Sequence, residues 1–194
     1  MPRNYTGLTR NAPLHFQLDA GAYYKNYDLT QEFNAQQDKL IGATAGGGSF
    51  SAVPTVRQIE VDGKKGAVEG FDALDDWAVT MTCTVKELTY DNMADALGMA
   101  KVEEVTTPAG GYRKITGKGE VEADDYHDNI TWIGRLSGSL KPIIIQIYKA
   151  LCTSGLALSP ADKSEGTVPM TMRGSYSLDD METPPFAIFY PPVP

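Results

Sequence analysis

The fold class follows from one stretch, residues 77–87, with the sequence WAVTMTCTVKE. Apolar side chains occupy every second position from Trp77 to Val85, and the positions between them hold mainly threonine. Because successive side chains of a β-strand point to opposite faces, this alternation predicts a strand with one face in the core. Its other face is expected to be polar, uncharged and rich in threonine.

A single helix is predicted directly after this strand, at residues 90–97. Thr89 is a favourable N-cap residue, Asp91 suits the positive end of the helix dipole, and Gly98 suits the C-terminal stop. A helix this short is held by packing more than by its intrinsic propensity.

Strand-like patterns recur along most of the chain. They predict further strands at 14–18, 55–61, 112–122, 129–137, 141–152, 167–178 and 185–190, with a tight turn at 62–66 and a polar connection at 159–166. About ten short strands and one helix predict a mainly β fold with a minor α component. The expected architecture is a two-sheet β-sandwich or barrel with one flanking helix.

The length of 194 residues suits one domain with extended ends. Residues 14–190 are the predicted β domain, preceded by a polar N-terminal arm at 1–13 and followed by a proline-rich tail at 191–194. Residues 27–39 are polar and predict a long loop. Because the arm and this loop carry no core periodicity, we expect the fold to tolerate deletion of the arm or shortening of the loop.

The chain has 17 basic and 25 acidic residues and a net charge of −8. Such a surface is poorly suited to gripping nucleic acid, because phosphate binding depends on Lys and Arg. Its longest apolar stretch, 142–147, is far too short for a membrane span, and no signal-peptide pattern opens the sequence. We therefore expect synthesis in a cytoplasm, with Cys83 and Cys152 as buried free thiols.

No pattern of catalytic or cofactor-binding residues emerges. The glycine-rich run 42–49 lacks the Lys-Ser/Thr ending of a phosphate loop, and a flexible backbone that must turn or approach a neighbour closely explains it better. Residues 124–128, DDYHD, favour a solvated acidic loop over a metal site. His15 and His127 lie in no nucleophile motif, and Trp77 and Trp132 are expected to be core anchors. The sequence predicts no enzyme, no cofactor and no metal.

Residues 18–98 resemble the tail tube (major tail) proteins of long-tailed bacteriophages. The order and spacing of several stretches carry the resemblance: 18–22 (LDAGA), 41–44 (IGAT) with Gly46 and Gly47, 59–63 (IEVDG) with Gly66 and Gly70, and 87–89 (ELT) before the short helix. Beyond residue 98 the resemblance extends only to an abundance of strands.

The resemblance implies a structural virion protein that self-assembles. Six copies would form a ring whose inner strands join into one barrel, and stacked rings would form the tail tube through which double-stranded DNA passes as non-specific cargo. Implied partners are other copies of the chain and the tape measure, tail terminator and distal tail proteins. The alternatives are a tube of a contractile injection or type VI-like secretion system, or a monomeric virion decoration or carbohydrate-binding sandwich.

Candidate assembly residues follow from this expectation. Closing the barrel would pair the open sheet edges, and the arm, the 27–39 loop and the tail are candidates for joining rings. An acidic wall would let DNA pass without binding it. The candidate channel-facing residues are Glu120 and Glu122, on a predicted strand face shared with Thr116 and Lys118. The candidate flexible or inter-subunit residues are Gly46, Gly47, Gly48 and Glu60.

Overall fold

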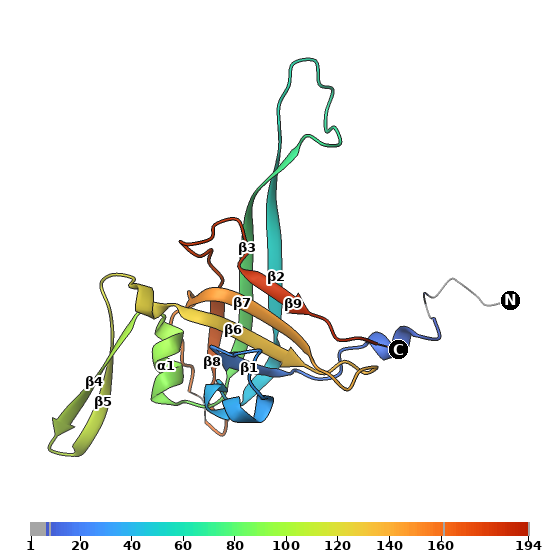
Figure 1. Cartoon of the computed structure of the whole chain (residues 1–194). Coiled ribbons are helices and arrows are strands. Elements are labelled where there is room, and N and C mark those ends of the chain that lie inside the picture. The colour runs from blue at the N-terminus through green and yellow to red at the C-terminus, as the bar shows by residue number, and fades with distance from the viewer. Residues whose placement is uncertain (1–6, 8, 161, 194) are drawn as a thin grey trace.

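The computed structural model describes residues 7, 9–160 and 162–193, and strands dominate this part of the chain (Figure 1). The strands are β1 (Ala22–Lys25), β2 (Thr44–Gln58), β3 (Asp72–Val85), β4 (Ala100–Thr107), β5 (Gly110–Gly117), β6 (His127–Gly134), β7 (Ile143–Cys152), β8 (Val168–Arg173) and β9 (Phe186–Phe189). One α-helix, α1 (Tyr90–Leu97), and three short 3-10 helices, η1 (Ala12–His15), η2 (Phe33–Lys39) and η3 (Ala123–Asp125), complete the described elements.

All strand pairs are antiparallel. Six strands follow the order β1-β6-β7-β8-β3-β2, β9 pairs with β7, and β4 and β5 form a separate two-stranded sheet. The large sheet folds over at the end of β7, where only Leu151 and Cys152 pair with β8. Most of β7, with β1, β6 and β9, therefore faces β2, β3 and β8 across the core. The predicted mainly β fold with two sheets and one helix is confirmed.

The core lies between these two layers. β3 contributes Val79, Met81, Cys83 and Val85, each at most 5% exposed, and the threonines between them are half-exposed, as the alternation predicted. The opposite layer contributes Tyr23, Ile130 and Ile147, among others. Cys83 and Cys152 are buried free thiols, as expected. Trp77 and Trp132 pack partly buried against this core, which confirms them as core anchors.

Helix α1 has the predicted bounds and the predicted caps. Thr89 Oγ1 accepts a hydrogen bond from the backbone N of Asn92 at 3.1 Å, and Gly98 ends the helix with φ 75°. The Asn92 side chain is buried and donates to the backbone oxygens of Ile41 and Glu87, both at 2.9 Å. Packing thus holds the helix, with Ala96 inside the core.

Several strand predictions were wrong in place or extent. The predicted strand 14–18 is η1 followed by an isolated bridge from Gln17 to Leu136, because Pro13 occupies the first turn of the 3-10 helix. Strands β1 and β4 were not predicted. The predicted strand 55–61 is instead the far end of β2, which begins at Thr44 inside the glycine-rich run and ends at Gln58.

Residues 27–39 belong to the fold, contrary to the expectation that they are dispensable. Tyr27 and Gln36 are buried, and η2 occupies half of the segment. Gln36 accepts from the backbone N of Asp28 and donates to the backbone O of the same residue, both at 2.8 Å. Shortening the segment would therefore remove buried contacts.

The described part of the predicted arm is also attached at its inner end. The backbone N of Gly138 donates to Leu14 O at 2.8 Å, and Ser137 Oγ donates to Pro13 O. Residues 1–6 and 8 of the arm and residue 194 of the tail lie outside the described residues.

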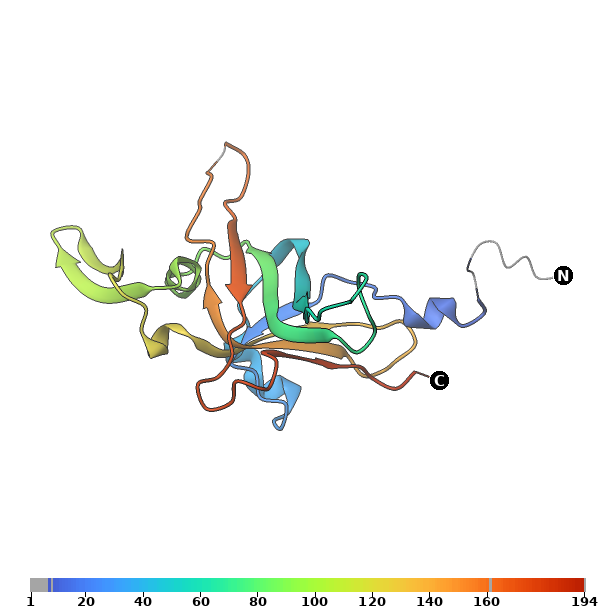
Figure 2. The same ribbon diagram turned by 90° about the horizontal axis from the view of Figure 1, so that it is seen from above.

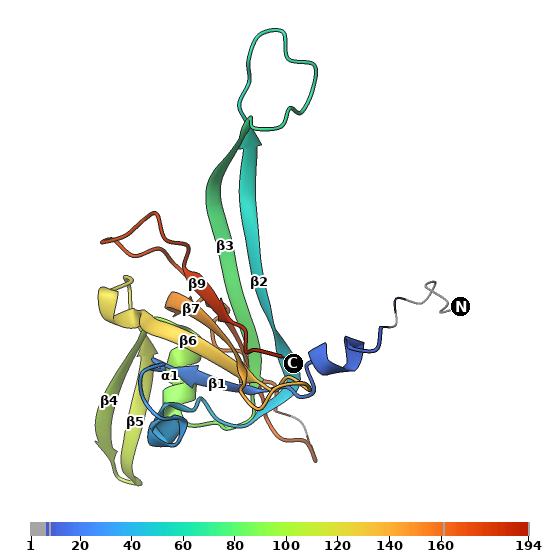
Figure 3. The same cartoon turned by 45° about the vertical axis from the view of Figure 1, so that its right-hand side comes forward.

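Two hairpins project from the body (Figures 1 and 3). The β2–β3 hairpin is the longer, with strands of 15 and 14 residues. Its outer part projects because β8 pairs with β3 only over Thr80–Val85. The β4–β5 hairpin leaves the body beside α1, where the Arg113 guanidinium lies 3.8 Å from the ring centroid of Tyr90. Seen from above, β4–β5 and η1 project in opposite directions (Figure 2).

Gly48 marks a place where no side chain fits. A Cβ atom there would lie 2.0 Å from the Tyr23 hydroxyl and 2.2 Å from the Thr82 backbone oxygen. We expect Gly48→Ala to lower the free energy of unfolding by about 2 kcal/mol, since overpacking typically costs ~1–3 kcal/mol and the Thr82 backbone cannot yield freely. Thermal unfolding measures this effect. The control is Gly111→Ala, where a Cβ atom meets nothing within 4 Å, and an equal loss in both variants would contradict the steric explanation.

Candidate assembly surfaces

The part of the β2–β3 hairpin beyond the body, residues 53–76, is here called the outer hairpin. It carries seven large apolar side chains that are each 37–55% exposed. They come from both strands and from the connecting loop: Val53, Val56, Ile59, Val61, Val68, Phe71 and Leu74. This concentration on one projecting element is unlike the scattered single apolar residues that are normal on a monomer surface.

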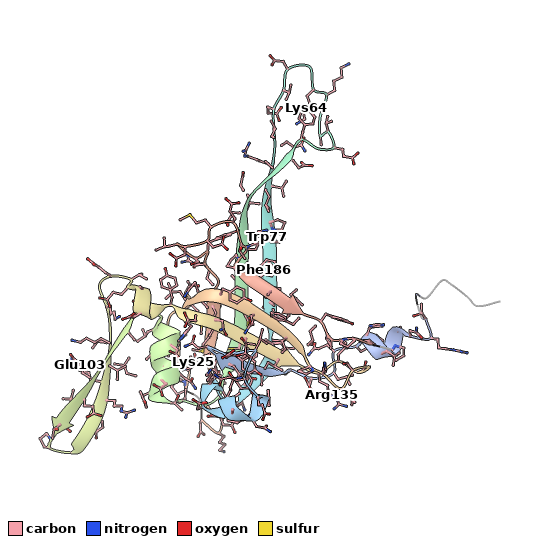
Figure 4. The ribbon with its side chains drawn as sticks, viewed as in Figure 1. Lys25, Lys64, Trp77, Glu103, Arg135 and Phe186 are labelled. Atoms are coloured by element: carbon pink, nitrogen blue, oxygen red, sulfur yellow. The ribbon has the colours of Figure 1, made fainter. Side chains whose placement is uncertain are left out.

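Strand register shows that part of this apolar surface continues the core face. The pair Ala52–Val79 belongs to the core, and the next pair on the same face is Pro54–Trp77. Trp77 is covered by Phe186 of β9, with ring centroids 5.3 Å apart (Figure 4). The following pair, Val56–Leu74, has no such cover, and both side chains are more than half exposed. The sheet face therefore stays apolar beyond the point where the body ends.

The outer hairpin also has open backbone edges. Among the described strands, β2 pairs only with β3, and β3 pairs with β8 only over Thr80–Val85. Trp77 N donates to the Tyr176 hydroxyl at 3.1 Å, and the strand beyond it, toward Asp72, pairs with β2 alone. Exposed edges of this length are templates for pairing with another chain.

The candidate flexible or inter-subunit residues lie at opposite ends of the whole β2–β3 hairpin. Glu60 is in its outer loop, 86% exposed, with its carboxylate 3.8 Å from Lys64 Nζ near the tip (Figure 4). Gly46 and Gly47 both have φ 74° and lie at the body end, where the register shifts between Thr44 and Gly48. The close backbone approach expected of the glycine-rich run occurs at Gly48.

The predicted strand face at 116–122 does not exist. β5 ends at Gly117, so only Thr116 of the four candidates lies on a strand. Lys118 Nζ instead donates to Asp125 at 2.8 Å and to Glu122 at 2.6 Å. The hydrogen bond to Asp125, followed by that to Glu122, raises the pKa of Lys118. Glu122 is the N-cap of η3, and Glu120 lies exposed between the two elements. The alternating pattern therefore does not continue as a strand beyond Gly117, because Lys118 forms local hydrogen bonds with Glu122 and Asp125.

One cluster of charged groups joins three elements of the body. Asp95 of α1 accepts from Lys25 Nζ of β1 at 2.5 Å, and its other oxygen lies 3.4 Å from His127 Nε2 of β6. Burial pushes the pKa of Asp95 upward, but the hydrogen bond from His127 and the charge of Lys25 outweigh it and hold the pKa below its ordinary value. Each side chain is at most 23% exposed, so this carboxylate attaches the helix to the sheet.

Metal ligands and cavities are the other features that could hold a small partner. Within residues 7, 9–160 and 162–193, no group of three or more His, Cys, Asp or Glu is placed to hold a metal ion. A cavity of about 990 Å³ lies between the β6–β7 turn and residues 19–22. Its acid, Asp19, already accepts from the backbone N of Gly21 at 3.1 Å and of Arg135 at 3.3 Å. None of the helices in the described part of the chain is long and apolar enough to span a membrane.

Sequence reasoning missed the outer hairpin and the β4–β5 hairpin as surfaces. A usable signal was present for both. Apolar residues flank the Asp62-Gly63 turn on each side, and Pro108 and Gly110 separate two strand-like segments. Neither signal tells whether such residues are covered by the rest of the chain.

No protein-family model matches the sequence, and no curated protein matches it closely enough to be counted as similar.

Proposed function

We propose that this chain is a structural virion protein, the subunit of a phage tail tube in which rings of identical copies stack around a channel for double-stranded DNA. The observation that carries the proposal is the outer hairpin, with exposed apolar side chains and open strand edges on an element that the body does not cover. The sequence resemblance over residues 18–98 suggests that the assembly is a tube of stacked rings.

Covering the outer hairpin favours association of like chains. Burying apolar surface is worth roughly 25 cal/mol per Å². A neighbouring copy that packs on Val56 and Leu74 would extend the core across the subunit boundary. Pairing at the β2 edge would at the same time satisfy backbone groups that invite aggregation in a monomer.

A ring needs two different complementary edges on each subunit. The β2–β3 hairpin has them: β2 is open on one side, and the outer part of β3, which β8 does not reach, is open on the other. Joining the β2 edge of one copy to the opposite edge of the next produces a head-to-tail contact that closes into a ring. The β4–β5 hairpin, with exposed Val102 and Tyr112, supplies a second projecting contact for neighbouring copies.

A concentration series tests the proposal directly. Purified protein should pass from monomers to rings or tubes as its concentration rises, because association replaces exposed apolar surface and open edges with contacts. Sedimentation velocity follows the transition, and negative-stain microscopy shows the shape of the product. A chain that remains monomeric at the highest soluble concentration would contradict the proposal and favour a single binding module.

A further inference from the structure

The face of β2, β3 and β8 that points away from the core consists largely of hydroxyl side chains. In strand register, Thr82 lies between Ser49 and Thr171, and Ser51 lies beside Thr80. Ser49 Oγ and Thr82 Oγ1 are hydrogen bonded at 2.7 Å. The hydroxyl face is defined here by Ser49, Ser51, Thr80, Thr82, Thr84 and Thr171, none of which is charged, although 22% of all residues are.

The bulk of the folded chain lies on the other side of this layer. Val79 and Met81 of β3 point into the core, where they meet β1, β6 and β7. Helix α1 joins the same core through Ala96, and β9 packs on it through Phe186. The hydroxyl side chains are half-buried by their neighbours within the sheet or exposed.

Because the rest of the chain lies on one side of the β2, β3 and β8 layer, only one face of this layer can point into a ring. When copies join through the edge of β2 and the open outer part of β3, the sheet layers form a closed wall. The second layer and α1 need more room than the bare sheet face, and the outside of a ring has the larger circumference. The bulky side therefore turns outward and the bare face turns inward.

We propose that the hydroxyl face lines the channel of the assembled tube and is the surface that passing duplex DNA meets. The inference rests on the proposed function and adds the residues and chemistry of the channel wall. It replaces the acidic wall that Glu120 and Glu122 had been expected to form.

A hydroxyl wall suits the passage of a polyanion. Duplex DNA carries one negative charge per ~1.7 Å, and tight binding comes from counterion release by Lys and Arg. Neutral hydroxyl groups release no counterions, and their hydrogen bonds to phosphate exchange readily with those to water. Charges lie at the margins of the face, where Arg173 pairs with Thr80 and Asp76 pairs with Thr55.

The test is the accessibility of a cysteine placed on this face. Ser51→Cys is exposed in the single subunit and is made in full-length protein. Assembled tubes are labelled with a small biotin maleimide and then probed with streptavidin, which is too bulky to follow a channel sized for a duplex. The native thiols add little background, since Cys83 and Cys152 are buried and burial raises the pKa of the Cys83 thiol to about 12.

We expect biotin along the tubes but streptavidin only at their ends, with full streptavidin binding after the tubes are dissociated. Leu178→Cys, on the loop before β9 and 90% exposed, is the control for an outward position and should be decorated along the tube. Streptavidin along the length of Ser51→Cys tubes, or of Thr82→Cys tubes as a second variant, would overturn the channel assignment. Failure of the wild-type protein to assemble would overturn the proposed function itself, and would be seen before any labelling.

Discussion

Replacing Val56 and Leu74 together by aspartate should abolish assembly while leaving the monomer folded. These two side chains face each other across β2 and β3, where the core face continues beyond the body. In the proposed interface each new carboxylate would be buried without a partner, which costs several kcal/mol. A loss of about 3 kcal/mol per contact raises the concentration needed for assembly about a hundredfold.

The monomer should be almost unaffected, because both side chains are already more than half exposed. We expect its free energy of unfolding to stay within about 0.5 kcal/mol of the wild type. Sedimentation velocity, negative-stain microscopy and thermal unfolding measure the two effects separately. The matched control is Leu178→Asp with Met181→Asp, which adds the same charge to two exposed side chains of the β8–β9 loop. Assembly of the hairpin variant at the wild-type concentration would remove the outer hairpin from the interface.

Asp95→Asn should cause a large loss of stability at neutral pH. The substitution keeps the shape of the side chain but removes the charge that Lys25 faces at 2.5 Å and His127 at 3.4 Å. The cluster is mostly buried, so a lysine left without its counter-charge is costly. We expect a loss of about 2–3 kcal/mol, below the ~3–5 kcal/mol of a fully buried pair. Asp124→Asn, an exposed acid on η3, is the charge-matched control.

The difference between Asp95→Asn and the wild type should depend on pH. Because the folded-state pKa of Asp95 lies below the ordinary value of 3.8, the folded state holds this proton less tightly than the unfolded state does. The stabilisation by the Asp95 carboxylate is therefore complete above its ordinary pKa of 3.8 and is lost as the pH falls through its folded-state pKa. Thermal unfolding from pH 7 down to pH 3 should show the two proteins converging. A difference that stays constant over this range would mean that the carboxylate charge is not its source.

Short-range patterns in the sequence determined the β-rich class, the buried face of β3 and the whole of α1. The alternation from Trp77 to Val85 and the caps Thr89 and Gly98 act on neighbours within a few residues, so they can be recognised without the rest of the chain. The same patterns placed the cores of β6, β7 and β9 correctly.

Turns and side-chain hydrogen bonds that the alternation does not reveal decided what these patterns left open. Pro13 favours the 3-10 helix η1 where the alternation predicted a strand. Lys118 bridges Glu122 and Asp125, so the strand that was predicted to hold both Thr116 and Glu120 ends before Glu120. The polar 27–39 segment became part of the fold because Gln36 satisfies the backbone of Asp28 in a buried place.

The candidate surfaces depend most on tertiary structure. Val56 and Leu74 have the same local pattern as core residues, and only the extent of the opposite layer decides that Trp77 is covered and they are not. The threonine-rich face of β3 was visible in the sequence, but its position on the bare side of a three-stranded layer follows from pairings with β2 and β8. Alternation determines which side chains share a face, whereas the packing of distant elements determines what that face meets.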